Sequence, residues 1–137
     1  MRMLRHNSQI ACPRTQLITS KLQRNLCCYR NYILSNNFPE LPQIVTELGL
    51  DNYFDGCVVS AIVGYDKPRK EIFDYAKKLA GNPEKCIMIG DNPVDDIKGA
   101  KMAGFETVLV NDRHPDYSGE YCDYICKTLT DMLDVFK

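Results

Sequence analysis

Short apolar runs alternate with helix-like patterns along the chain from Tyr32 onward. Continuous apolar runs predict strands at residues 32–34, 57–63, 86–89, 107–110 and 121–126. Apolar residues at helical spacing predict helices over 41–50, 68–81 and 94–104, and a closing helix that carries Leu129, Met132, Leu133 and Phe136. Strand–helix alternation of this kind indicates βαβ units. The pattern therefore predicts an α/β, three-layer Rossmann-like fold, with a mostly parallel sheet and helices on both faces.

The N-terminal segment differs from the rest in charge. Residues 1–30 hold six Lys/Arg and no Asp or Glu, whereas residues 31–137 hold eleven basic and eighteen acidic residues. We therefore expect a basic N-terminal segment, 1–31, ahead of a core domain, 32–137. Residues 8–12 are a candidate strand, and a candidate helix follows them. Two other interpretations stay open: a mitochondrial transit segment, or a leader on a truncated gene product.

Composition restricts the class of protein. At 137 residues the chain is long enough for one domain. It has no run near the roughly 18 apolar residues of a membrane span. Its seven cysteines form no Cys-x-x-Cys pair, which favours free thiols in a reducing compartment. The acidic balance after residue 30 disfavours nucleic-acid binding. We expect a cytoplasmic protein without membrane or nucleic-acid partners, with mitochondrial targeting as the minor alternative.

Candidate anion-binding groups follow the first two predicted strands. Ser35 and Asn36 come directly after the strand at 32–34, and Lys67 lies in the loop after the second strand. Ligands of parallel sheets bind at the carboxyl ends of the strands, where a hydroxyl and an ammonium can bind phosphate oxygens. Each group alone has a plainer interpretation, as a turn and helix cap or as a solvated lysine.

Candidate metal ligands follow the third predicted strand. Asp91 ends the run "IMIGD", and Asp95 and Asp96 come four and five residues later. Carboxylates suit Mg²⁺, a hard cation that prefers oxygen ligands. Asp95 and Asp96 would also complement the dipole of the helix that begins there, without any metal. Asp91 is harder to explain structurally, because a carboxylate at the end of a buried strand needs a partner.

Four segments together resemble the C-terminal half of the haloacid dehalogenase-like hydrolases, a superfamily dominated by phosphatases. They are "YILSNN", "SAIVGYDKPRKEIF", "CIMIGDNPVDDIKGAKMAGFETVLV" and "CDYICKTLTDMLDVF". The first three resemble the second, third and fourth motifs of the superfamily, and the last resembles its usual tail. The resemblance implies Mg²⁺-dependent hydrolysis of a small phosphorylated substrate.

The resemblance also implies roles for the candidate residues. Ser35 would hydrogen-bond the transferring phosphoryl group, with Asn36 nearby. Lys67 would neutralise the phosphate and orient the nucleophile. Asp91 would hold Mg²⁺, and Asp96, or Asp95, would assist it.

The chain departs from the superfamily at its first motif. That motif, Asp-x-Asp-x-Thr/Val, supplies the nucleophile and the general acid/base. Here no Asp-x-Asp occurs, the first Asp is Asp51, and the cap segment that selects the substrate is absent. A weak alignment on Thr15 puts Ala11 and Pro13 in place of the two acids. We therefore expect a phosphatase-type chain that is inactive. The alternative is a non-catalytic module that binds phosphate, a nucleotide or a protein; a receiver-like signalling domain is disfavoured because the acids come late.

The missing motif has a structural consequence. In the superfamily its strand lies between the strands of the second and fourth motifs, so its loss exposes two inner sheet edges. The chain must fill the gap with residues 8–12, pair the two neighbouring strands directly, or borrow a strand from another molecule. The last route predicts a homo-oligomer formed through sheet edges.

Overall fold

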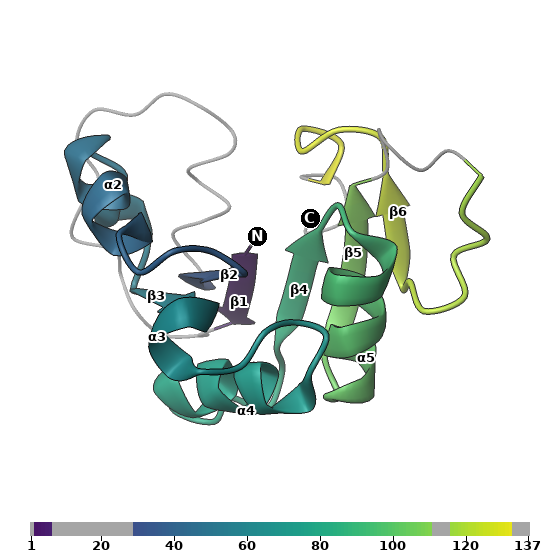
Figure 1. Cartoon of the computed structure of the whole chain (residues 1–137). Helices are drawn as coiled ribbons and strands as arrows, with labels where there is room; N and C mark the ends of the chain where they lie inside the picture. Colours follow the sequence, from purple (N-terminus) through teal and green to yellow (C-terminus); the bar gives the residue numbers. More distant parts are fainter. Residues whose placement is uncertain (1, 7–28, 111–115, 133–137) are drawn as a thin grey trace.

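The computed structural model describes residues 2–6, 29–110 and 116–132, the first of these as backbone only. It contains a six-stranded sheet with the order β3-β2-β1-β4-β5-β6 (Figure 1). The strands are β1 (Arg2–His6), β2 (Tyr29–Ser35), β3 (Gly56–Val59), β4 (Ile87–Gly90), β5 (Glu106–Val110) and β6 (Tyr124–Cys126). The helical elements are α2 (Leu41–Glu47), η1 (Asp51–Tyr53), α3 (Ser60–Val63), α4 (Lys70–Leu79), η2 (Pro93–Lys98) and α5 (Gly99–Met102). The predicted α/β class is confirmed.

The central strand β1 comes from the chain's own N-terminal segment. Arg2 pairs with Ile33 of β2 and with Ile89 of β4, and both pairings are antiparallel. The gap is therefore filled, but by Arg2–His6 rather than by residues 8–12, which lie outside the described residues. Direct pairing of β2 with β4 does not occur. The inner edges of β2 and β4 are both occupied, so β3 and β6 form the outer edges of the described sheet.

The other strands are parallel to their neighbours. β2 pairs with β3, β4 with β5, and β5 with β6, all in parallel. The carboxyl ends of β2 and β4 therefore meet at one edge of the sheet, together with the first residue of β1. This edge is where ligands of α/β sheets bind.

Several predicted boundaries are wrong. The apolar run at 57–63 is strand only to Val59, and its second half forms α3, which ends at Gly64 with a φ of 82°. A short apolar run cannot distinguish a strand from a helix, and here the left-handed residue after it ends a helical turn. The predicted strand at 121–126 is ordered as strand only from Tyr124. The predicted helix at 94–104 is a π-helix, η2, followed by α5.

Two apolar clusters lie on opposite faces of the sheet, because successive side chains of a strand alternate. On one face Leu34 and Met88 pack against Ile72 and Phe73 of α4, and Phe73 makes an edge-to-face contact with Phe105 at 5.7 Å. The other face carries a second cluster, composed of Ile87, Ile89, Val108, Cys126 and Met132. Met132 belongs to the predicted closing helix, whose remaining residues, 133–137, lie outside the described part of the chain.

Candidate phosphate-binding site

The predicted site residues gather at the carboxyl ends of β2 and β4. Ser35 is the last residue of β2, and Asp91 directly follows Gly90, the last residue of β4. Lys67 lies in the loop between α3 and α4. Strand direction alone thus brings a hydroxyl and a carboxylate to the same edge, and the loop adds an ammonium group.

A buried ion pair joins two of the predicted residues. Lys67 Nζ lies 2.5 Å from Asp96 Oδ1, and the two side chains are only 9% and 4% exposed. The second carboxylate oxygen of Asp96 accepts a hydrogen bond from the Asn92 backbone N–H at 3.1 Å. Both oxygens of Asp96 are therefore engaged, and the ammonium of Lys67 is held at a defined position.

Gly90 makes the approach of Asp96 possible. A Cβ atom at position 90 would overlap the carboxyl group and the Cβ of Asp96. Position 90, directly before Asp91, therefore requires glycine, because no larger residue fits beneath the Asp96 side chain.

Asn92 organises the start of η2. Its side-chain oxygen accepts hydrogen bonds from the N–H groups of Val94 at 2.9 Å and Asp95 at 3.0 Å, which caps the helical turn. Its amide nitrogen donates to Asp95 Oδ2 at 3.2 Å. Asp95 thus forms hydrogen bonds at the start of the helix, as expected if it stabilises the helix start without a metal. A π-helical turn such as η2 is frequent at functional sites.

Asn36 connects the end of β2 to the Lys67 loop. Its side-chain oxygen accepts from the Lys67 N–H at 2.8 Å, and its side-chain nitrogen donates to the Lys67 carbonyl at 3.0 Å. Both amide groups therefore bind the backbone of Lys67. Asn36 was predicted as a phosphate ligand; the geometry places it as a clamp on the residue that carries the ammonium.

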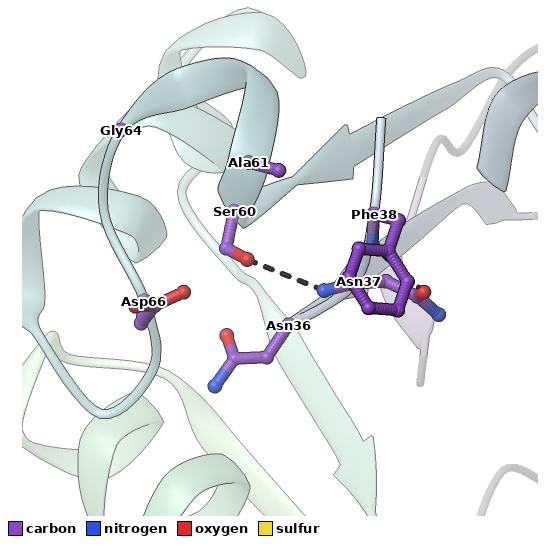
Figure 2. A pocket seen from close by; sticks show the side chains of 7 residues that line it. All are labelled: Asn36, Asn37, Phe38, Ser60, Ala61, Gly64 and Asp66. Carbon is purple, nitrogen blue, oxygen red and sulfur yellow. Dashed lines mark hydrogen bonds between the residues drawn. The ribbon is translucent and has the colours of Figure 1, made fainter. Parts of the chain in front are cut away.

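Ser60 is a polar residue that the sequence analysis missed, because it lies in a run predicted as strand. It is 7% exposed, and its Oγ accepts a hydrogen bond from the Asn37 N–H at 3.2 Å. Ser60, Asn36, Phe38 and Asp66 line a surface depression (Figure 2). Its volume is about 600 Å³. The depression lies next to the predicted site, since Asn36 follows Ser35 and Asp66 precedes Lys67.

The acidic residues do not form a ready metal site. Among the described residues, no group of three or more His, Cys, Asp or Glu side chains is positioned to hold a metal ion. Asp96 already binds Lys67 and Asn92 N–H, and Asp95 binds Asn92. The donor set therefore does not fit a tight Mg²⁺ site.

The described cysteines offer no activated nucleophile. Cys57, Cys86, Cys122 and Cys126 are not in disulfide bonds. Burial raises the pKa of the Cys57 thiol, and burial together with the nearby Asp123 raises the pKa of Cys122. A raised pKa lowers the thiolate fraction at neutral pH and so weakens nucleophilic attack.

The fold and the site define an α/β core with hydroxyl, ammonium and carboxylate groups at the strand ends, as in phosphoryl-handling enzymes. The sequence model of the haloacid dehalogenase-like hydrolases matches residues 10–104. The chain therefore belongs to the haloacid dehalogenase-like hydrolases, and the predicted resemblance is confirmed.

Named relatives agree with this assignment. Pyrimidine 5'-nucleotidase YjjG of Escherichia coli is 45% identical over 85 residues, which are 60% of this chain and 38% of that protein. Glyceraldehyde 3-phosphate phosphatase of Pyrococcus furiosus is 34% identical over 100 residues, which are 68% of this chain and 41% of that protein. The crystal structure of a phosphatase of the same superfamily from Thermococcus onnurineus has a TM-score of 0.72 at 27% identity, and the match covers 84% of this chain and 53% of that one. The chain thus spans about two fifths of the length of these curated relatives.

No helix within the described residues has both the length and the apolar character that crossing a bilayer would need.

Proposed function

We propose that this chain is a phosphate-binding core of the haloacid dehalogenase-like type that does not hydrolyse phosphomonoesters by itself. The observation that carries the proposal is the central strand. β1 occupies the position between β2 and β4, runs antiparallel to both, and has the sequence "RMLRH" without an acid. The groups that we propose to bind phosphate lie at the end of β2 and in the Lys67 loop, whereas β1 offers no carboxylate to attack phosphorus.

Binding would use Ser35 and Lys67. An ammonium carries a full positive charge, which attracts a phosphate even while the ammonium is paired with Asp96. The Asn36 clamp and the Asp96 pair fix the Lys67 side chain before a ligand arrives, which lowers the entropy cost of binding. The expected ligands are small phosphomonoesters, the class that the names of two relatives indicate for those proteins.

Hydrolysis would need an in-line nucleophile that these groups do not supply. Asp96 accepts bonds at both oxygens, and Asp95 binds Asn92 at the start of η2. Asp91, with Asp95 and Asp96, is our proposed contact region for Mg²⁺. Because Mg²⁺ gives up its waters reluctantly, we expect weak binding to such an incomplete donor set.

The decisive experiment measures binding and turnover on the same pure chain. ³¹P NMR titration with inorganic phosphate should show binding that Lys67→Ala weakens and Lys70→Ala leaves unchanged. Lys70 is the matched control because its ammonium is exposed and pairs with Asp74 on α4. With an aryl phosphate and millimolar Mg²⁺, hydrolysis should stay at background.

Two outcomes would contradict the proposal. Absence of phosphate binding would contradict the claim that the chain is a phosphate-binding core. Robust hydrolysis by the unmodified chain would contradict the claim that the chain does not hydrolyse phosphomonoesters. If Asp91→Asn abolished that hydrolysis, a carboxylate of this chain would perform the attack. Calorimetry with Mg²⁺ alone should give little heat, and a submicromolar site would show that the proposed donor set is incomplete.

A further inference from the structure

A basic residue of the central strand β1 lies at the edge of the sheet that carries the candidate site (Figure 1). Arg2 is the first residue of β1, and the register pairs it with Ile33 of β2 and with Ile89 of β4. Ser35 comes two residues after Ile33, and Asp91 comes two residues after Ile89. The register therefore places Arg2 between the strand that ends with the hydroxyl and the strand that leads to the carboxylate.

The same register makes Arg2 and Ser35 diagonal neighbours on one face of the sheet. Residues that pair directly share a face, and residues two apart along a strand share it as well. Diagonal neighbours lie about 7–8 Å apart, a separation that long side chains can bridge. Ser35 is half-buried and Asp91 is exposed, so a ligand can reach this part of the edge.

The candidate residues at this edge carry a surplus of negative charge. Three of them, Asp91, Asp95 and Asp96, are carboxylates. The single ammonium, that of Lys67, already pairs with Asp96. Phosphate is itself an anion, and like charges next to it oppose its binding. Tight binding of Mg²⁺ would offset the surplus, but the donor set does not fit it, because both oxygens of Asp96 are engaged. Phosphate binding at this edge therefore needs another cation.

We propose that Arg2 supplies this cation and makes phosphate binding independent of Mg²⁺. A guanidinium is charged at every physiological pH, and its planar fork of donors matches pairs of phosphate oxygens. β1 runs antiparallel to β2 and β4, so it brings its first residue, rather than its last, to the ligand edge. The central strand thus contributes a binding charge there instead of a nucleophile. This inference rests on the proposed function, because it concerns the phosphate bound by Ser35 and Lys67.

The experiment measures the dissociation constant of inorganic phosphate by ³¹P NMR in a buffer that contains EDTA. The unmodified chain should bind phosphate there, and millimolar Mg²⁺ in place of EDTA should change the constant by less than about twofold. Arg2→Gln should weaken binding about tenfold, the loss expected for one hydrogen bond between charged groups. Arg2→Lys keeps the charge but loses the fork of donors, so binding should weaken only about threefold.

The matched control is Arg5→Gln, which removes the same charge from the same strand. Arg5 pairs with Arg30 and lies about 10 Å further from the ligand edge. That distance exceeds the screening length at physiological salt, so the substitution should change the constant by less than about twofold. The measurement in EDTA needs no variant, and Arg2→Lys preserves the charge, so the test stands even if Arg2→Gln does not fold.

The outcomes separate this inference from the proposed function. Equal phosphate binding by Arg2→Gln and by the unmodified chain overturns this inference alone. Phosphate binding that requires Mg²⁺, or that Arg5→Gln weakens as much as Arg2→Gln does, also overturns it alone. Absence of phosphate binding both with and without Mg²⁺ overturns the proposed function, and this inference with it.

Discussion

The buried Lys67–Asp96 pair allows a quantitative prediction. Asp96→Asn replaces a carboxylate oxygen 2.5 Å from an ammonium with an uncharged group of the same shape. The substitution creates no cavity, so its effect reports electrostatics and hydrogen bonding rather than packing.

The expected magnitude follows from burial. The side chains of the pair are 9% and 4% exposed, so water cannot replace the lost partner of the Lys67 ammonium. Removal of one member of a buried pair costs about 3–5 kcal/mol. Because the carboxamide oxygen of Asn can still accept a hydrogen bond from the ammonium, we expect the lower end, about 3 kcal/mol. This is a large share of the 5–15 kcal/mol that typically stabilises a domain.

The assay is urea unfolding followed by circular dichroism. Lys67→Met, Asp96→Asn and the double variant complete a double-mutant cycle. Once Lys67 is uncharged, Asp96→Asn should cost less, so the two effects should be less than additive by about 1–3 kcal/mol. The control cycle uses Lys70 and Asp74, whose side chains are 61% and 51% exposed; its expected coupling is about 0.3–0.5 kcal/mol.

The reasoning fails if Asp96→Asn costs less than about 1 kcal/mol, which is the range of exposed pairs. It also fails if the buried and exposed cycles give equal coupling energies. Either result would mean that water reaches the Lys67 ammonium and that the site is not fixed before a ligand binds.

Three further predictions concern neighbouring residues. Gly90→Ala should lower the unfolding free energy by about 2–3 kcal/mol, because the new methyl group overlaps the Asp96 carboxyl. Asn36→Ala should weaken phosphate binding several-fold and cost about 1 kcal/mol of stability, since both bonds to the Lys67 backbone are lost. For Asp123, burial raises the pKa, but the bonds from an ammonium and from a backbone N–H outweigh it and lower the pKa overall. The stabilisation from Asp123 should therefore be full above its unfolded pKa of about 3.9 and be lost as the pH falls through the folded value.

Each of these predictions has its own control. Gly104→Ala adds a methyl group where no atom lies within 4 Å, so its cost comes from a φ of 84° alone, whereas Gly90 has no positive φ and its cost comes from overlap alone. Asn37→Ala removes only an exposed cap on the Phe38 N–H and should leave phosphate binding closer to normal than Asn36→Ala does. For Asp123, urea midpoints of the chain and of Asp123→Asn should differ at pH 7 and converge near pH 2. A constant difference across that range would contradict the assigned pKa direction.

The sequence predicted the parallel strands because their signal is local. The run at 86–89 is continuous and apolar, ends in glycine, and became β4. β1 could not be recognised in this way, since "RMLRH" has only two apolar residues, which are adjacent and flanked by basic ones. Its place depends on pairing with Ile33 and Ile89, which are distant in sequence. Non-local pairing of this kind is invisible to a local pattern.

The site was predictable to the extent that strand direction defines it. Lys67 and Asp96 were predicted as site residues because ligands bind at the carboxyl ends of parallel strands. In the structure the two residues form one ion pair. The role of Asn36 was not predictable, because its bonds go to the Lys67 backbone and depend on the path of a loop. Ser60 was missed because α3 begins where the apolar run suggested a continuing strand.

If the chain is inactive as proposed, the direction of β1 determines what could give it hydrolytic activity. A parallel central strand would deliver its carboxyl end, and any acid that follows it, to the edge that holds Ser35. β1 instead ends with His6 paired to Tyr29, at the start of β2. Four residues at about 3.3 Å each put the carboxyl end of β1 about 13 Å from Arg2, its first residue. A single acid placed after His6 would therefore face the wrong edge. Hydrolysis should return only when a parallel strand that ends in Asp-x-Asp-x-Thr replaces β1, and Asp91→Asn in that variant should abolish it again.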